Sequence, residues 1–116
     1  MANWRSKLII CLLLGGSLAI WPVLTNAETV FVKHRGQVNL SPFECNWIQR
    51  SSFIERLCYD SREEYVIVKL NGTYYHYCEV PSSIVEAWHR ADSMGRFYNQ
   101  NIKKRYDCRI NRVPEY

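Results

Sequence analysis

The most distinctive candidate site is a pair of tyrosines, Tyr75 and Tyr77, spaced two apart in a run rich in β-forming residues. Aromatic side chains at this spacing point to one face of a strand, where they can stack on bases as in sheet-based RNA-binding domains. The alternative is a structural role, in which both rings pack beneath helices and their hydroxyl groups reach polar partners at the rim. We favour the structural role, because the register of the predicted hairpin places both rings on the more apolar face of the sheet.

A basic cluster near the C-terminus is the second candidate. Between positions 96 and 112 only Asp107 opposes six cations, which are Arg96, Lys103, Lys104, Arg105, Arg109 and Arg112. These charges could bind phosphate, nucleic acid or an anionic membrane surface. They also fit the solvated face of an amphipathic helix, whose last-turn cations suit the helix dipole, and we prefer that interpretation.

The first 27 residues have the pattern of a secretory signal peptide. Two basic residues precede an apolar stretch, Leu8–Ile20, and a helix-breaking Pro22 and a small-residue site ending at Ala27 follow it. A retained membrane anchor is disfavoured, because the apolar run from Leu8 to Leu24 spans 17 residues and a membrane-spanning helix needs about 20. We predict cleavage after Ala27 and export to the periplasm or outside of a bacterial cell. The remaining 89 residues carry 13 basic and 11 acidic side chains, a net charge of +2.

Four cysteines remain in the predicted mature chain, namely Cys45, Cys58, Cys78 and Cys108. An even number of cysteines in a short exported chain predicts two disulfides. Such a small domain benefits from covalent cross-links, because it buries a limited share of its surface. The spacings of 13, 20 and 30 residues contain no CxxC pair, so a zinc site is disfavoured.

No catalytic constellation is evident in the sequence. His34, His76 and His89 lie far apart, with no HxxH or HExxH spacing. Nucleophilic catalysis by cysteine requires a thiolate, which the predicted disulfides remove, and none of the serines lies in a GxSxG turn. We therefore predict a protein that is not an enzyme and that needs no metal or other cofactor.

The strongest local signal is a β-hairpin around Asn71-Gly72. Runs Tyr65–Leu70 and Thr73–Val80 flank this dipeptide, which favours a two-residue type I′ turn and so fixes the register. One face then carries Val66, Val68, Leu70, Tyr75 and Tyr77, and we assign it to the core beneath the helices. The opposite face carries Tyr65, Ile67, Lys69, Tyr74, His76 and Cys78. We expect Lys69, Tyr74 and His76 on that second face to be exposed and available to a partner.

The rest of the chain predicts an α+β fold. Ser52–Tyr59 would add a first strand, giving a three-stranded antiparallel meander with Cys58 opposite Tyr65. After Pro81 the apolar period changes from 2 to 3.6, which predicts a helix to about Ala91 and a second from Ser93 to about Tyr106. Both helices would pack on one face of the sheet. The N-terminal arm, residues 28–50, is predicted either as a short hairpin or as loosely ordered chain.

The predicted sheet restricts the disulfide pairing. Cys58 and Cys78 would flank the central strand, about two strand spacings or 9.5 Å apart, against a usual Cα limit of about 7 Å. We therefore predict Cys45–Cys58, which closes a short loop, and Cys78–Cys108. The second pairing conflicts with the face assignment, since Cys78 points away from the predicted helices. Either it bonds around the sheet edge or the assignment is wrong.

The sequence resembles the KTSC domain, a small domain named after the C-terminus of some lysyl-tRNA synthetases and also found alone in bacterial proteins. The resemblance covers about Ser51–Tyr106. It rests on Ser51-Ser52-x-Ile54, Tyr59-Asp60, Gly72, Tyr75-x-Tyr77, Val80-Pro81, Ala91-x-Ser93-x-Gly95-x-Phe97-Tyr98-Asn99 and Ile102-Lys103-x-x-Tyr106. The resemblance implies a domain of unknown function for which RNA binding has been suggested. This chain departs from the family in its signal segment and in having Cys58 and Cys78.

Three segments follow, with a signal peptide at 1–27, an arm tied by a disulfide at 28–50 and a KTSC-like domain at 51–112. We predict a small, exported, disulfide-stabilised binding module that is not an enzyme and recognises a protein or an anionic polymer. The candidate binding residues are Tyr75, Tyr77, Lys103, Lys104, Arg105 and Arg109. The alternatives are RNA binding and a structural or assembly role in the cell envelope.

Overall fold

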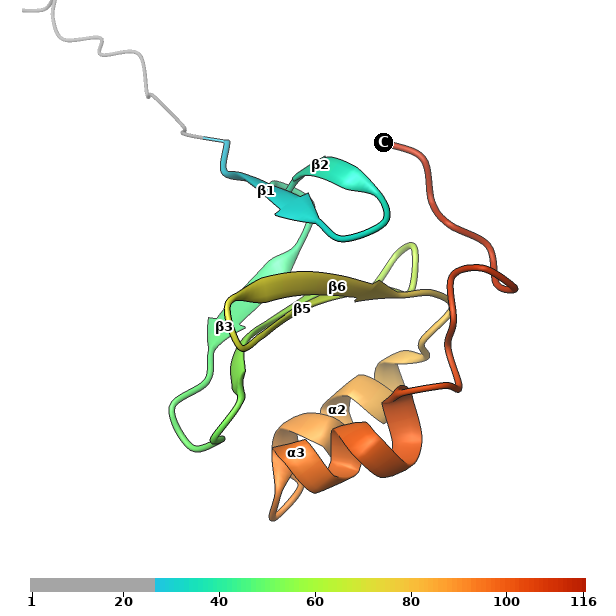
Figure 1. The fold of residues 1–116 in the computed structure, drawn as a ribbon. Helices are drawn as coiled ribbons and strands as arrows, with labels where there is room; N and C mark the ends of the chain where they lie inside the picture. Colours follow the sequence, from blue (N-terminus) through green and yellow to red (C-terminus); the bar gives the residue numbers. More distant parts are fainter. Residues whose placement is uncertain (1–26) are drawn as a thin grey trace, which may run out of the picture.

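The computed structural model describes residues 27–116, so the predicted signal segment, apart from Ala27, lies outside the described residues. Within this range no helix is both long enough and apolar enough to cross a membrane. The chain folds into one strongly twisted sheet with helices packed against one face (Figure 1).

Residues 27–116 form a sheet of six strands in the order β2-β1-β6-β5-β4-β3. The strands are β1 (Thr29–Val32), β2 (Gly36–Asn39), β3 (Glu44–Trp47), β4 (Ile54–Asp60), β5 (Tyr65–Leu70) and β6 (Thr73–Tyr77). The pairing is antiparallel except between β1 and β6, which are parallel and meet at the single pair Val32 and Tyr74. Helix α2 (Ser82–Arg90) follows the sheet, and α3 (Met94–Phe97) continues as the π-helical turn η2 (Tyr98–Ile102).

The prediction of a three-stranded antiparallel sheet is wrong, although the α+β class is correct. The meander β4-β5-β6 is present, but the arm extends it at both edges, with β3 pairing with β4 and the β1–β2 hairpin pairing with β6. The arm strands have only four residues each, too few for a clear alternating pattern. They form because the outer strands of the meander present unpaired N–H and C=O groups that the arm can bind.

The central hairpin has the predicted geometry. Asn71 and Gly72 have φ values of 47° and 85°, as a type I′ turn requires, and Val68 pairs with Tyr75 and Ile67 with His76. The β4–β5 register is offset from the prediction, since Cys58 lies opposite Ile67 rather than Tyr65. From Arg56 to Asp60 this offset is two residues, so these side chains keep their predicted face, whereas an irregularity between Ile54 and Arg56 brings Ile54 opposite Leu70.

The helix-side core lies between the helices and one sheet face, as predicted. It contains Val66, Val68 and Leu70, and the buried Trp88 and Tyr98 from the helices. The Trp88 ring stacks on Tyr98 at a centroid distance of 6.0 Å, and its Nε1–H donates to the Met94 carbonyl at 3.1 Å.

The arm-side core covers the opposite face, for which the sequence predicts exposed residues. Tyr65 and Ile67 are fully buried there against apolar side chains of the β1–β2 hairpin, which are Val30, Val32 and Val38. The prediction of an exposed second face is therefore wrong, because the arm folds over it. Lys69, Tyr74 and His76 are only partly exposed.

Both disulfides have the predicted pairing. Cys45 and Cys58 lie opposite each other on β3 and β4, with their Cα atoms 3.9 Å apart. Cys78 and Cys108 join the end of β6 to the C-terminal segment, with a Cα separation of 5.0 Å. The second helix ends at Ile102 rather than near Tyr106, since Lys103 is extended. The chain then passes around the sheet edge, which resolves the conflict between this disulfide and the face assignment.

Candidate functional site

A groove of about 710 Å³ runs beside the outer edge of β6. It is lined by residues 33–35 of the β1–β2 turn, residues 75–77 of β6 and five residues between Lys104 and Val113 in the C-terminal segment. We call this the β6 groove. Its residues come from three parts of the chain, which only the folded sheet and the Cys78–Cys108 disulfide bring together.

The β6 groove is strongly cationic. Lys33, Arg35, Lys104 and Arg109 line it, together with His34 and His76. Asp107 is the acidic residue in this lining, and the Arg109 guanidinium already pairs with it through Nη2 at 2.6 Å and Nε at 3.0 Å. Hydrogen bonds from Arg109 lower the pKa of Asp107 to about 2, so this carboxylate stays ionised at neutral pH. The remaining cations have no carboxylate partner in the groove lining.

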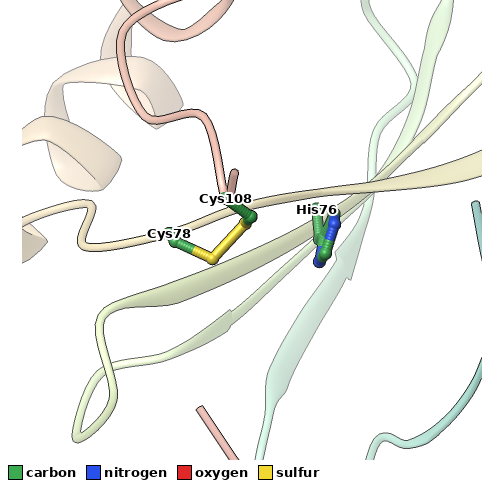
Figure 2. A group of neighbouring side chains, drawn as sticks. All are labelled: His76, Cys78 and Cys108. Atoms are coloured by element: carbon green, nitrogen blue, oxygen red, sulfur yellow. A yellow bond between two sulfur atoms is a disulfide. The ribbon is translucent and has the colours of Figure 1, made fainter. Parts of the chain in front are cut away.

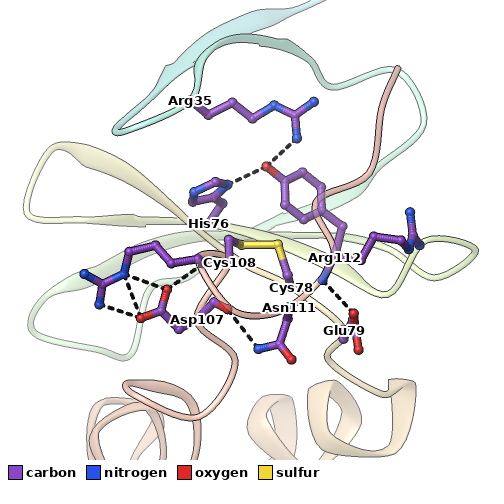
Figure 3. The surroundings of a disulfide bond; sticks show 10 residues. Arg35, His76, Cys78, Glu79, Asp107, Cys108, Asn111 and Arg112 are labelled. Atoms are coloured by element: carbon purple, nitrogen blue, oxygen red, sulfur yellow. Dashed lines mark hydrogen bonds and ion pairs between the residues drawn. A yellow bond between two sulfur atoms is a disulfide. The ribbon is translucent and has the colours of Figure 1, made fainter.

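A hydrogen-bonded chain fixes the histidine of the groove. Arg35 Nη1 donates to the Tyr65 hydroxyl at 3.0 Å, and that hydroxyl lies 2.7 Å from Nδ1 of His76. Burial lowers the pKa of His76, and the nearby Arg35 charge lowers it further. Arg35 can only donate, so we assign the Tyr65 proton to the bond with Nδ1 and the imidazole proton to Nε2. Figure 3 shows Arg35 and His76 beside the Cys78–Cys108 disulfide.

Tyr75 and Tyr77 lie at the border between the groove and the helix-side core. Both rings pack partly against that core, and the Tyr77 hydroxyl lies 2.5 Å from the Tyr98 hydroxyl. Burial raises the pKa of Tyr77, and the bond to Tyr98 raises it further. Lys33 Nζ lies 5.7 Å from the centre of the Tyr75 ring. Both tyrosines therefore contribute to packing and also line one side of the groove.

The structure separates the basic cluster that the sequence suggested. Lys104 and Arg109 line the β6 groove, whereas Lys103 and Arg105 are exposed outside it. These residues do not lie on a helix, because η2 ends at Ile102 and Lys104 has a positive φ of 75°.

Arg112, the last member of the basic cluster, is turned toward acidic residues. Its guanidinium pairs with Glu63 at 3.0 Å, and its backbone N–H donates to Glu79 at 2.6 Å (Figure 3). Sequence reasoning missed Lys33 and Arg35. The only signal for them was the short hairpin that the sequence allows within residues 28–50, and their place beside β6 depends on a contact between residues 42 positions apart, Val32 and Tyr74.

A possible metal-ligand group is also present beside the groove. Atoms of His76, Cys78 and Cys108 lie within 4.8 Å of one another (Figure 2). The two sulfur atoms are bonded to each other, and a metal ion binds the thiolate form of cysteine. In the oxidised protein this group therefore offers only the imidazole as a ligand.

Comparison with known proteins finds similarity over the part of the chain that contains strands β4 to β6 and the helices. The KTSC domain model matches residues 50–106. An uncharacterized protein from Stutzerimonas stutzeri (strain A1501) is 36% identical over 58 residues, which cover 49% of this chain and 82% of that protein.

A solved structure of a KTSC domain protein has a similar fold. The crystal structure of a KTSC domain protein from Yersinia pestis aligns with a TM-score of 0.53 and 24% identity, over 56% of this chain and 92% of that one. At this identity the likeness concerns the fold alone. The residues that the KTSC domain model matches include β4, β5, β6 and the helices. Together with the relative that is 36% identical, this match shows that the chain belongs to the KTSC domain family.

Proposed function

We propose that this protein is a small exported binding module that holds an anionic ligand in the β6 groove and performs no catalysis. The observation that carries the proposal is the charge of the groove. Lys33, Arg35 and Lys104 have no carboxylate partner in the lining, and Asp107 is already paired with Arg109. Clustered cations in a concave surface raise the local potential and attract anions.

The construction of the groove supports a binding role. Residues 33–35 and 107–113 lie outside the matched region, 50–106, so both flanks of the groove, apart from Lys104, lie beyond the part of the chain that matches the KTSC domain. The Cys78–Cys108 disulfide holds one flank to β6, and the β1–β6 pairing holds the other. A groove that is rigid before binding loses less conformational entropy when the ligand arrives.

Export is supported by the two disulfides, since such bonds persist in oxidising compartments. We expect the mature chain in the periplasm or outside the cell, beginning at Glu28. Cell fractionation followed by intact mass measurement tests this. Recovery of the chain in the cytosol with its first 27 residues intact would show that it is not exported.

The absence of catalysis is part of the proposal. A general base works best with a pKa near the operating pH and an orienting partner that raises its basicity. His76 instead contacts a tyrosine hydroxyl and faces Arg35, and its pKa is lowered. Binding without turnover is the activity that these contacts favour.

Binding measurements on the mature, oxidised protein test the groove. Fluorescein-labelled polyglutamate and a single-stranded oligonucleotide serve as anionic probes, titrated at several salt concentrations. We expect salt-dependent binding, because each ion pair formed releases counterions. The variant Arg35→Ala/Lys104→Ala removes two cations of the groove and should weaken binding about tenfold or more.

The variant Lys103→Ala/Arg105→Ala is the matched control. It removes the same charge from exposed positions outside the groove, and we expect it to weaken binding less than threefold. Equal losses in the two variants would show that net charge, not the groove, attracts the probe. Absence of binding to both probes at low salt would contradict the proposed function.

A further inference from the structure

Within residues 27–116, the outer edge of β6 contains one position, His76 in the β6 groove, at which neither the backbone N–H nor the C=O has a hydrogen-bond partner. In an antiparallel pair, successive residues direct their N–H and C=O groups alternately toward and away from the partner strand. Along β6, Tyr74, His76 and the following Cys78 direct these groups away from β5. The Tyr74 carbonyl accepts from the Lys33 N–H at 2.9 Å, and the Cys78 N–H donates to the Tyr106 carbonyl at 2.8 Å.

His76 lies between these two bonded positions. Strand β1 pairs with β6 at Tyr74 alone, and in residues 27–116 no hydrogen bond is formed by the outward N–H and C=O of His76. The gap has a structural cause on each side. Strand β1 turns away at His34, whose φ is 70°, and the backbone hydrogen bond from the C-terminal segment is made at Cys78, not at His76.

The chemistry of this gap selects one class of ligand. In an extended peptide, one residue offers both an N–H donor and a C=O acceptor. These groups can bond to the backbone C=O and N–H of His76, respectively. A phosphodiester oxygen can accept from the His76 N–H but provides no donor for the carbonyl. The cations on the two flanks, Lys33 and Arg35 on one and Lys104 on the other, favour carboxylates next to the paired residue.

The geometry points to an extended acidic peptide as the ligand of the β6 groove, added to β6 as a short strand paired with His76. This inference rests on the proposed function and names its ligand. The peptide backbone bonds to His76 in place of the missing continuation of β1, and the acidic side chains contact the flanking cations. Tyr75 and Tyr77 remain packed against the helix-side core and need not stack on the ligand.

Amide hydrogen exchange measured by NMR gives a direct test. The probe is a labelled peptide of alternating glutamate and valine residues, and the matched control alternates glutamine and valine. We expect the His76 amide to exchange rapidly in the protein alone and at least tenfold more slowly with saturating acidic peptide. Tyr75 and Tyr77 are internal references, because their N–H groups face β5 and are protected in both states.

Replacing single amide N–H groups of the peptide by ester oxygens separates backbone pairing from charge. We expect one position to lose about tenfold in affinity, since its partner at the His76 carbonyl would lose its donor, while esters at the adjacent positions change affinity little. Equal affinity for all esters, with no protection of His76 but with salt-dependent binding, would reject strand addition and leave the anionic groove intact.

Two further outcomes are decisive. Tighter binding of an oligonucleotide of equal charge would reject the peptide as the preferred ligand class and support a nucleic-acid ligand. Failure of both the peptide and the oligonucleotide to bind at low salt would contradict the proposed function itself, and the inference with it.

Discussion

The two faces of the sheet are covered in different ways. On the helix side, large aromatic residues from a continuous stretch of chain, including Trp88 and Tyr98, pack on β5 and β6. On the arm side, short strands and the C-terminal segment bring small apolar side chains such as Val30 and Val38. Both disulfides involve cysteines of the arm-side core, Cys58 and Cys78. The comparison shows that packing of one continuous stretch of chain stabilises the helix side, whereas on the arm side, where Tyr65 is also fully buried, covalent bonds hold distant segments in place.

The largest expected effect concerns the helix side. Trp88→Ala removes a fully buried ring that stacks on Phe97 and Tyr98 and should lower the free energy of unfolding by about 3–5 kcal/mol. Urea denaturation of the oxidised protein measures the loss. A loss well below this range would contradict the view that burial of this ring is a main source of stability on the helix side.

The next effects concern the arm side. For loops of 13 and 30 residues, the chain-entropy model predicts losses of about 3 kcal/mol for Cys45→Ala/Cys58→Ala and about 4 kcal/mol for Cys78→Ala/Cys108→Ala. The two variants form a matched pair, because only the second bond borders the β6 groove. We expect polyglutamate binding to weaken in the second variant alone. Equal weakening in both would show that global stability controls binding.

A smaller effect separates steric contact from backbone strain. A Cβ atom at Gly95 would lie 2.5 Å from Cε1 of Phe53, so Gly95→Ala should destabilise by about 1–3 kcal/mol. Gly36, on the arm side, has open space around a Cβ but a φ of 102°, so Gly36→Ala tests strain alone. Adding Phe53→Leu should recover part of the Gly95→Ala loss and none of the Gly36→Ala loss.

The smallest effect is a pH dependence on the arm side. The pKa of His76 is lowered by burial and by Arg35, so between this pKa and the unfolded value of about 6.5 the unfolded chain binds more protons. The contribution of neutral His76 to the free energy of unfolding is therefore complete above pH 6.5 and decreases as the pH falls below this value. Replacing His76 by Gln should reduce this slope in urea denaturation between pH 7 and 5.

His89 supplies the control for this pH dependence. Its pKa is also lowered, first by burial, but it lies on helix α2, away from the arm-side core. His89→Gln should reduce the slope while leaving the exchange of the Tyr65 and Ile67 amides unchanged. A slope that is identical in the wild-type protein and in His76→Gln would contradict the assignment to His76.

Local features of the fold could be predicted from the sequence, and distant contacts could not. Asn71-Gly72 determines its own turn, and Pro81 precedes helix α2 as expected. The parallel contact of β1 with β6 depends on which edge the arm reaches, and four-residue strands carry too little pattern to indicate it. Helix periodicity continues to Tyr106, but the chain leaves the helix at Ile102 and reaches β6 through Cys108.

The candidate site follows the same division. Lys104 and Arg109 were predicted from charge alone and do line the groove, while Lys103 and Arg105 share that charge and do not. Charge in a sequence indicates attraction to anions but not the direction in which a side chain points. Lys33 and Arg35 could be found only once the sheet order was known.

Most of the groove lining contributed by segments other than β6 lies outside residues 50–106, which has a consequence for how such a protein can change over time. Substitutions in residues 33–35 or 107–113 alter what the groove can hold, while the helix-side core that stabilises the domain remains untouched. On the proposed function, much of what determines ligand preference thus lies outside the stretch that forms the helix-side core. On the proposed function, replacing these two segments would change the ligand while the domain core is kept, in the way that loops diversify on a fixed scaffold.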